Sequence, residues 1–590
     1  MAVAVLETKH RTLNCRISER SECYCRSSMT MPHRHLRHRL LTALASAAVA
    51  CAAGAQDRTD DIRLPDLGSS ANALISPQEA QDYGAMMLQQ MRALDMVVDD
   101  PLLDDYINNL GFRLVANSAR PKDHFAFFIA KDPVINAFSA PGGYIGMNSG
   151  LIVITRSEDE LAAVMAHEIG HITQNHLQRA YEAAKKDTPL LALVALGAIA
   201  AGGAAGGQAA AAALAGGQGL LMQKQINFTR KDEAEADRTG IETLARSGYD
   251  PNAMAGFFQR MEDEMSADSG GIDVPSLLLD HPVTSQRISD AKARAGSLIA
   301  AQKLQPKGNL LDKERWAQQT APIAYVKDPT SLLAAGSASK DLNTYLLMRE
   351  RVRVLSDDAY RMSNYYAGLL GRQDGRYDTP ENRYGYALAL TRSGQGGKAI
   401  AQLQPILSKH PDNLVLRLAM ADARLQDGQR AAALDIYAAL NTESPRNKAI
   451  GLAYANALIQ GGSKTQAEQA ASMLRPMLED TDEPGLFTAY ARASERAGEA
   501  VRAGEAYAQA SYLSGRPFDA MEQLKALLKR NDLDYYARAR IQAHIADLTP
   551  LVLELRKRRV ATDDNPDGTS QTQQQFGSGC HGRLCFSAKK

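Results

Sequence analysis

The chain has few cysteines, and none of them lies in its body. The long stretch between positions 51 and 580 lacks the residue entirely, because the six cysteines are Cys15, Cys23, Cys25, Cys51, Cys580 and Cys585. A thiolate nucleophile, a zinc site built of cysteines and a disulfide framework are therefore excluded from that stretch. A body without cysteine is compatible with an oxidising compartment.

The chain also lacks an excess of either charge. Lys and Arg together number 67, as do Asp and Glu, so the composition predicts neither a nucleic-acid partner nor binding to an anionic membrane surface. The length of 590 residues and the hydrophobic fraction of 45% are typical of two or three globular domains.

Charge is absent altogether from residues 188–222. A membrane span is one interpretation of this segment, and a Gly/Ala-rich helical hairpin is the other. The hairpin is favoured because eight glycines interrupt the segment, and each glycine inside a helix costs roughly 1 kcal/mol relative to alanine. We therefore expect at most peripheral membrane association.

The N-terminus carries the pattern of an export signal. A basic stretch, HRHLRHR (33–39), is followed by a short apolar stretch that ends in Ala53-Gly54-Ala55. This pattern predicts a signal peptide over 29–55, with lipidation of Cys51 as an alternative. Residues 1–28 are expected to be untranslated or disordered, and the polar tail 561–590 is expected to be disordered.

A repeat of about 34 residues begins near residue 380. Gly394, Gly428, Gly462 and Gly498 are spaced by 34, 34 and 36 residues, with alanines five and seven residues before each and five after. Gly515 has similar surroundings. The period predicts tetratricopeptide repeats over 380–560, an all-α superhelix with a groove for polypeptide. Residues 311–379 are predicted as a helical connector or an irregular repeat.

Chemistry is suggested by the stretch MAHEIGHITQNH (165–176). Ser157 and Glu160 predict a capping box where its helix begins. His167 and His171 lie one helical turn apart and can face one ion, while Glu168 can reach a water molecule. The alternative is a solvated helix face, which only a third ligand would exclude. His176 is predicted on the same helix, one position off the ligand face.

The stretch RKDEAEADRTG (230–240) offers that third ligand. Glu233 and Asp237 are four residues apart on a predicted helix and so share a face, whereas Glu235 points about 200° away from Glu233. Glu233 can complete a metal shell, and Asp237 can orient a ligand or assist proton transfer. A solvated acidic face is again the alternative.

HEIGH followed by EAEAD resembles the M48 family of zinc metalloproteases, whose pattern is H-E-x-x-H followed by E-x-x-x-D. NAFSAPGGYIGMNSGLI (136–152) and LLLDHPVTSQRISDA (277–291) extend the resemblance. It implies an α+β zincin-like metalloprotease domain over 56–310, mostly helical with a small sheet, followed by the all-α tetratricopeptide-repeat superhelix. It also implies one Zn²⁺ per chain, and it assigns roles to site residues: ligands His167, His171 and Glu233, general base Glu168, and proton donor or outer partner Asp237.

His281 is assigned by the same resemblance. The family match implies that it is an additional zinc ligand that holds the enzyme latent, whereas a lone loop histidine is otherwise expected to cap or to pack. The predicted strands are HFAFFIA (124–130) and GGYIGMN (142–148). Substrate is expected to add in extended form to the edge of the second strand, near Gly143, Tyr144 and Ile145.

These residues support two classes of function. The first is a periplasmic zinc endopeptidase that acts on unfolded or misassembled outer-membrane proteins and meets the outer-membrane β-barrel assembly machinery through its repeats, as the wider resemblance implies. The second is a periplasmic chaperone or docking protein that uses the repeat groove with little proteolysis. A membrane-embedded protease using 188–222 as a span is a third interpretation.

Overall fold

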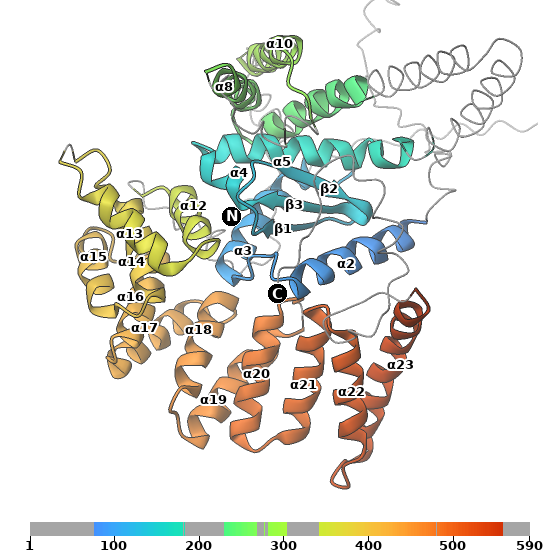
Figure 1. Cartoon of the computed structure of the whole chain (residues 1–590), viewed down its shortest axis with the longest axis vertical. Helices are drawn as coiled ribbons and strands as arrows, with labels where there is room; N and C mark the ends of the chain where they lie inside the picture. Colours follow the sequence, from blue (N-terminus) through green and yellow to red (C-terminus); the bar gives the residue numbers. More distant parts are fainter. Residues whose placement is uncertain are drawn as a thin grey trace, which may run out of the picture. The chain divides into compact units, whose positions relative to one another are not determined.

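The computed structural model describes residues 76–180, 182, 229–267, 277, 281–303, 342–373, 375–479 and 481–558. All of them belong to one compact unit, residues 68–590 (Figure 1). The predicted signal peptide, the 188–222 hairpin and the polar tail lie outside the described residues. Within the described part of the chain, every helix is too short or too polar to cross a membrane.

The N-terminal part combines helices with a small sheet, as predicted. Helices α2 (Pro77–Ala93) and α3 (Pro101–Ala116) precede strands β1 (Ala126–Ala130), β2 (Ala137–Ala140) and β3 (Tyr144–Asn148). The strand order is β1-β3-β2, with β1 parallel and β2 antiparallel to β3. The short helix η2 (Pro141–Gly143) joins β2 to β3, and Gly142 and Gly143 supply the positive φ angles of 75° and 87° that this reversal needs.

This strand order corrects the prediction that substrate adds to the edge of the strand near Gly143, Tyr144 and Ile145. Tyr144 and Ile145 lie in the central strand, which is paired on both sides, so their backbone groups have no free edge to offer. Both side chains are also buried. The edge strands are β1 and β2. Strand β2, whose four residues had not been predicted as a strand of their own, is the one that lines the cleft described below.

Helices α4 (Ser149–Ile154) and α5 (Glu158–Thr173) follow the sheet, and α8 (Ala253–Ala267) and α10 (Ser285–Lys303) pack beyond α5. Ser157 caps α5, since its hydroxyl accepts from the backbone N–H of Glu160 over 3.3 Å. The predicted capping box is only half formed. The Glu160 carboxylate accepts from the backbone N–H of Arg156 over 2.7 Å and pairs with Arg260 of α8.

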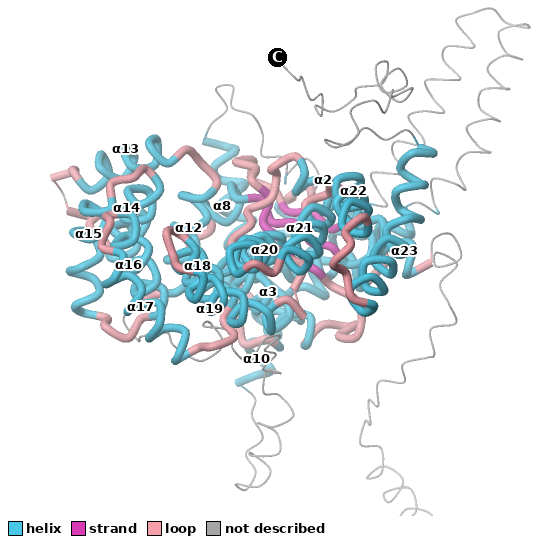
Figure 2. Tube along the Cα trace, turned by 90° about the horizontal axis from the view of Figure 1, so that it is seen from below, coloured by secondary structure: helices cyan, strands magenta, loops and turns pink. Residues whose placement is uncertain are grey.

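The C-terminal part is an array of paired helices that follow one another in chain order (Figure 2). Consecutive helices pack together, and the alternate helices α12, α14, α16, α18 and α20 also touch. The array consists of α12 (Thr344–Leu355), α13 (Ala359–Leu370), α14 (Pro380–Arg392), α15 (Gly396–Lys409), α16 (Leu414–Gln426), α17 (Arg430–Glu443), α18 (Lys448–Ile459), α19 (Lys464–Leu474), η3 (Arg475–Met477), α20 (Pro484–Ala497), α21 (Ala500–Leu513), α22 (Pro517–Leu528) and α23 (Tyr535–Arg558).

The repeated alanines serve the helix crossings of this array. Those five and seven residues before each repeat glycine are fully buried: Ala387, Ala389, Ala421, Ala423, Ala455, Ala457, Ala491 and Ala493. In the third turn the left-handed residue is Gly461 (φ 73°), one position before the Gly462 of the spacing. Gly515 (φ 73°) lies between α21 and α22, which makes it a turn between helix pairs rather than within one.

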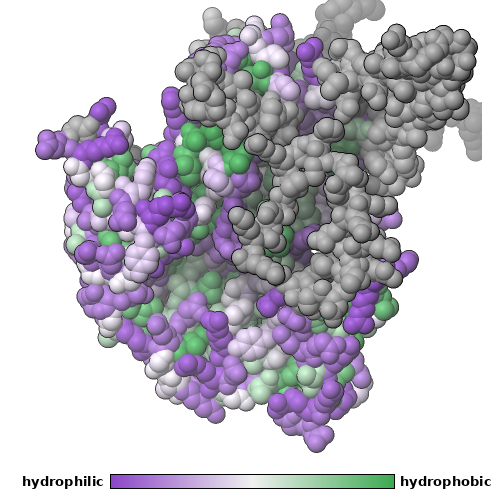
Figure 3. Space-filling model, in the orientation of Figure 1, coloured by the Kyte–Doolittle hydropathy of each residue, from purple (hydrophilic) through white to green (hydrophobic). Residues whose placement is uncertain are grey.

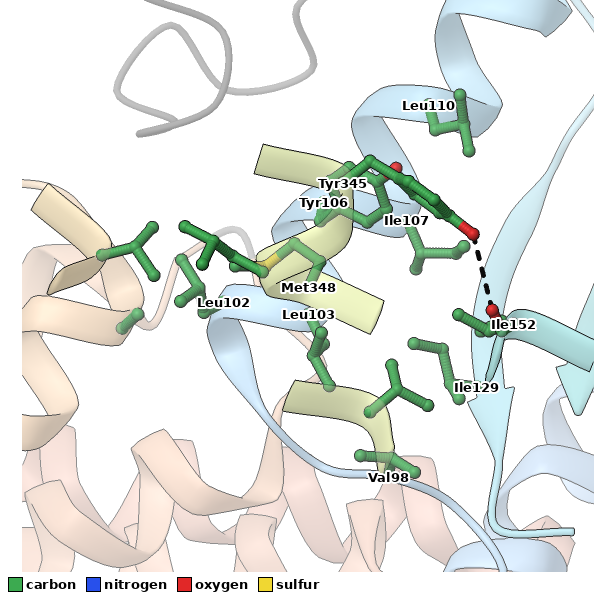
Figure 4. Close-up of a cluster of buried hydrophobic side chains, with 14 of the residues drawn as sticks. Val98, Leu102, Leu103, Tyr106, Ile107, Leu110, Ile129, Ile152, Tyr345 and Met348 are labelled. Atoms are coloured by element: carbon green, nitrogen blue, oxygen red, sulfur yellow. Dashed lines mark hydrogen bonds between the residues drawn. The ribbon is translucent and has the colours of Figure 1, made fainter. Parts of the chain in front are cut away.

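The array packs directly against the N-terminal part. Tyr345 and Met348 of α12 lie among apolar side chains of α3, including Leu102 and Tyr106 (Figure 4). The Tyr345 hydroxyl donates to the carbonyl oxygen of Thr155 over 2.9 Å. On the face of the array seen in Figure 3, hydrophilic side chains predominate and apolar ones gather in smaller patches.

Candidate active site

Three separate segments bring four ligand-bearing side chains to one point. His167 and His171 come from α5, Glu233 from the helical residues 229–246, and His281 from the segment before α10. Each offers one ligand atom, and the four atoms lie within 4.8 Å of one another. The predicted set of ligands is therefore assembled, and the interpretation as a solvated helix face is excluded, because His167 and Glu233 are buried.

The separations fit a single small cation. His167 Nε2 lies 3.0 Å from His171 Nε2 and 3.4 Å from His281 Nδ1. Glu233 Oε1 lies 2.9 Å from His281 Nδ1 and 3.5 Å from His171 Nε2. Tetrahedral ligands at zinc distances of about 2.0–2.1 Å are about 3.3–3.4 Å apart, and two imidazoles with a carboxylate form a set that zinc prefers.

Charge at the site also favours a cation. Burial lowers the pKa of His167, but the Asp237 and Glu233 carboxylates outweigh burial and raise it to about 10. Burial raises the pKa of Glu233, yet hydrogen bonds with His167 and His281 hold it well below its usual range. Burial and the neighbouring His167 lower the pKa of His171, which keeps its ring neutral and able to coordinate.

Glu168 lies beside these ligands without joining them. Its side chain is fully buried, and neither carboxylate oxygen has a hydrogen-bond partner among the described residues. A buried carboxylate is costly unless it is paired, so this group points to a polar partner at the site. His281 Nε2 lies 3.6 Å from Glu168 Oε1. Glu168 is thus placed to handle a proton beside the ligand atoms.

Asp237 acts on the far side of His167. Its Oδ1 lies 3.0 Å from His167 Nδ1, the nitrogen that faces away from the other ligands. Arg287 donates to both Asp237 oxygens, and its Nη1 lies 2.9 Å from Glu233 Oε2. This geometry supports the expected role of Asp237 in orienting a ligand. It does not support the alternative role as proton donor, because both oxygens are already engaged.

Arg287 also holds the segment that carries His281. Its Nη1 donates to the carbonyl oxygens of His281, over 3.3 Å, and Pro282, over 2.9 Å. One buried guanidinium therefore connects His281, Glu233 and Asp237. Arg287 had not been recognised in the sequence. A signal was available, because Arg287, Ala291 and Ala295 are spaced four apart on α10 and share its buried face.

His176 lies next to the site but not on α5. The helix ends at Thr173, and Asn175 takes a positive φ of 55° before a new helical run starts at His176. His176 Nδ1 lies 2.9 Å from His171 Nδ1, so it orients that ring. His176 Nε2 lies 3.3 Å from Glu235 Oε2. This contact confirms that Glu235 points away from Glu233.

His176, Asp232 and Glu235 form a second cluster of possible ligands. Arg179 already supplies positive charge there, since its Nη2 lies 3.1 Å from Asp232 Oδ1 and 2.6 Å from Glu235 Oε2. We therefore interpret this cluster as a network of ion pairs that stabilises the neighbouring site, and not as a second metal site.

A cleft of about 240 Å³ opens between β2 and the ligands. Ser139, Ala140 and Gly143 line one wall, and His171 and Glu233 line the other. The carbonyl of Asn136 accepts from the N–H of Asn148 over 3.0 Å. Because hydrogen-bonded pairs alternate in an antiparallel ladder, the backbone groups of Ser139 face away from β3, toward the free edge.

The fold and the site define a metallopeptidase, with two histidines on one helix and a carboxylate on another placed so that they could hold one metal ion. Comparisons with known proteins agree. Residues 101–295 match peptidase family M48. The beta-barrel assembly-enhancing protease of Yersinia pestis is 35% identical over 384 residues, which cover 63% of this chain and 76% of that protein.

Two further relatives match over a shorter range. The putative beta-barrel assembly-enhancing protease of Vibrio cholerae is 41% identical over 257 residues, which cover 44% of this chain and 52% of that protein. The beta-barrel assembly-enhancing protease of Escherichia coli K12 is 39% identical over 238 residues, 40% of this chain and 47% of that protein. These two matches span about half of each relative. The chain belongs to peptidase family M48.

Proposed function

We propose that the chain is a periplasmic zinc endopeptidase that acts on unfolded or misassembled outer-membrane proteins. The observation that carries this proposal is the convergence of His167, His171 and Glu233 at ligand separations, with Glu168 beside them. Relatives named beta-barrel assembly-enhancing protease support the substrate class. The predicted signal peptide supports export.

In the proposed reaction each residue of the site has a separate role. When bound, zinc supplies a Lewis acid that polarises a carbonyl and acidifies water. Glu168 takes the proton of the attacking water, and its burial keeps that carboxylate from being solvated. Asp237 and Arg287 fix the His167 ring, and His176 fixes the His171 ring.

Substrate binds, in this proposal, as a strand added to β2. The free edge of β2 offers the N–H and carbonyl of Ser139, and this strand lines the cleft that leads to His171. Recognition through the main chain needs little sequence preference, which suits unfolded β-strand proteins.

His281 is proposed to hold the enzyme latent. Its ring touches His167 and Glu233 and also faces Glu168, so it occupies the space that a substrate carbonyl and a water molecule must share. Displacement of the His281 segment would open that space.

The helix pairs are proposed to be tetratricopeptide repeats that dock a client or the β-barrel assembly machinery. The 34-residue spacing and the buried alanines at the helix crossings support this class of repeat. A chaperone or docking protein with little proteolysis is the second candidate, because the array forms a large part of the chain.

Replacement of Glu168 separates the two candidates. Glu168→Gln is expected to keep zinc and to lose about 100-fold or more of the hydrolysis of a dye-quenched unfolded protein. Glu158→Gln, at the start of the same helix and hydrogen-bonded to Tyr249, is the matched control and is expected to keep activity. Equal activity in both variants would favour the docking protein.

A further inference from the structure

A groove in the repeat array lies apart from the metal site. It encloses about 510 Å³, and its lining residues come from η3 and the residue that follows it, from α20, from α21 and from α23. From α21 it is lined at successive helical turns by Arg502, Glu505, Ala506 and Gln509. The remaining lining residues come from the neighbouring helices and turns: Arg475, Leu478, Phe487, Tyr490, Arg540 and His544.

Positive charge exceeds negative charge among these lining residues. Arg475, Arg502 and Arg540 contribute guanidinium groups, and Glu505 contributes a carboxylate. Arg540 is already paired with Glu505 through contacts of 3.2 and 3.3 Å. Of the other two guanidiniums, that of Arg502 is paired with Glu499 beside the groove, which leaves the charge of Arg475 in excess. The groove therefore favours an anion.

The guanidinium groups of Arg475 and Arg502 keep N–H donors that a ligand could use. Arg502 meets Glu499 through Nη1 alone, over 2.8 and 2.9 Å. Arg475 is exposed and makes no ion pair within the part of the chain that the structure describes. A planar guanidinium with unused N–H groups binds a carboxylate through two parallel hydrogen bonds.

Beside these charges the groove has an apolar floor. Phe487 is half-buried and Tyr490 is 8% exposed, and Leu478 and Ala506 adjoin them. An aromatic or aliphatic side chain placed on this floor would lose its contact with water, which stabilises the bound state. The groove thus favours a ligand that carries both a carboxylate and, close to it, an apolar side chain.

We propose that this groove binds an extended segment of a partner polypeptide that carries carboxylates next to aromatic or aliphatic side chains. Charge complementarity selects an anionic ligand, and the apolar floor selects a peptide over a polyphosphate or a nucleic acid. Glu505, which lies between Arg502 and Gln509 among the lining residues of α21, also disfavours a continuous polyanion. The inference rests on the proposed docking role of the repeats and names where, and by which chemistry, the partner is held.

Fluorescence anisotropy tests the proposal on the full chain carrying Glu168→Gln. The probe is a labelled synthetic peptide rich in glutamate and phenylalanine, and its control has glutamine at every glutamate. The acidic peptide is expected to bind about tenfold more tightly than its control, and Arg475→Gln with Arg502→Gln together should remove that advantage. Glu505→Gln should strengthen binding, because it releases Arg540.

Arg361→Gln is the matched control variant, because it removes an exposed arginine of α13 far along the chain from the groove. Equal affinity for the acidic and amide peptides would overturn the proposal, as would equal losses in the Arg361 variant and the double variant. It would also be overturned if an oligonucleotide displaced the peptide as well as unlabelled peptide does, or if binding required removal of residues 559–590. None of these outcomes bears on peptidase activity, which Glu168 and the ligands determine separately.

Discussion

Arg287 donates two parallel hydrogen bonds to Asp237, from Nε to Oδ2 over 2.7 Å and from Nη2 to Oδ1 over 2.8 Å. Asp237 in turn lies 3.0 Å from His167, so a continuous chain of contacts joins α10 to a histidine that we propose as a metal ligand. All three side chains are at most 8% exposed. In such surroundings a charge that loses its partner is expensive to keep.

We expect Arg287→Met to damage the site in two ways. It leaves the Asp237 and Glu233 carboxylates without their buried counter-charge, so unfolding free energy should fall by about 3–5 kcal/mol. Loss of the contact that orients His167 should weaken zinc binding by about 10- to 100-fold. Thermal unfolding and competition with a chelator measure the two effects.

Arg294→Met is the control for this prediction. Arg294 lies on the same helix and pairs with Glu242, but its side chain is 40% exposed. Its replacement should change stability by no more than about 1 kcal/mol and leave zinc affinity unchanged. Similar behaviour of the two arginine variants would show that the Arg287 network has no special role.

His281→Ala is expected to raise hydrolysis of an unfolded protein several-fold. The substitution removes the ring that lies against His167, Glu233 and Glu168, while the other three ligands stay in place. Turnover of a dye-quenched unfolded substrate, normalised to bound zinc, measures the effect. Unchanged or lower turnover with zinc retained would argue against latency through this residue.

Ser139→Pro tests the substrate edge. The N–H of Ser139 faces the free side of β2, so its removal should leave the sheet intact while depriving a substrate strand of one main-chain partner. We expect kcat/KM for an unfolded protein to fall about tenfold, which corresponds to about 1.4 kcal/mol. Ser139→Ala keeps the N–H and should be nearly neutral. Full activity of the proline variant would exclude edge addition at β2.

Much of the site follows from relationships within a single helix. The four-residue spacings of His167 with His171 and of Glu233 with Asp237 fix shared faces before any tertiary contact is known. Arg287 was missed because its partners come from two other segments. Its spacing with Ala291 and Ala295 indicates only that it lies on the buried face of α10, and not which groups it pairs with. Strand β2 was missed because four residues are too few for an alternating pattern to stand out.

The repeat array shows the same limit. Its period and its buried alanines could be predicted, because each repeat reproduces the same helix crossing. The adjacent Gly461 and Gly462 could not be distinguished by spacing, since either satisfies a period near 34. Only the backbone shows that the positive φ falls on Gly461.

Stability should depend on pH through Glu483, which lies where the array meets α3. Burial raises the pKa of this carboxyl from 4.5 to about 7, against the opposing effect of Lys448. The folded chain therefore holds this proton more tightly than the unfolded chain, and this contribution to stability is lost as the pH rises from 4.5 through 7. Glu483→Gln should be more stable than the parent by roughly 1–2 kcal/mol at pH 8 and by less at pH 5.

Glu443→Gln gives the opposite sign as a control. A hydrogen bond from Arg417 lowers the pKa of Glu443, so its contribution to stability is present above pH 4.5 and is lost as the pH falls. Urea unfolding at about pH 3, 5 and 8 compares the two variants, because the Glu443 contribution changes only below pH 4.5. A Glu483 variant whose stability relative to the parent does not change with pH would contradict the assignment.

The central claim is that His167, His171 and Glu233 hold one zinc ion, and metal analysis of purified chain after dialysis tests it most directly. Glu235→Gln provides the matched control, because Glu235 lies on the same helix but faces His176 and Arg179. The parent and Glu235→Gln should each retain one zinc per chain, and Glu233→Gln should lose most of it. Full zinc retention by Glu233→Gln, or equal loss in both variants, would contradict the account.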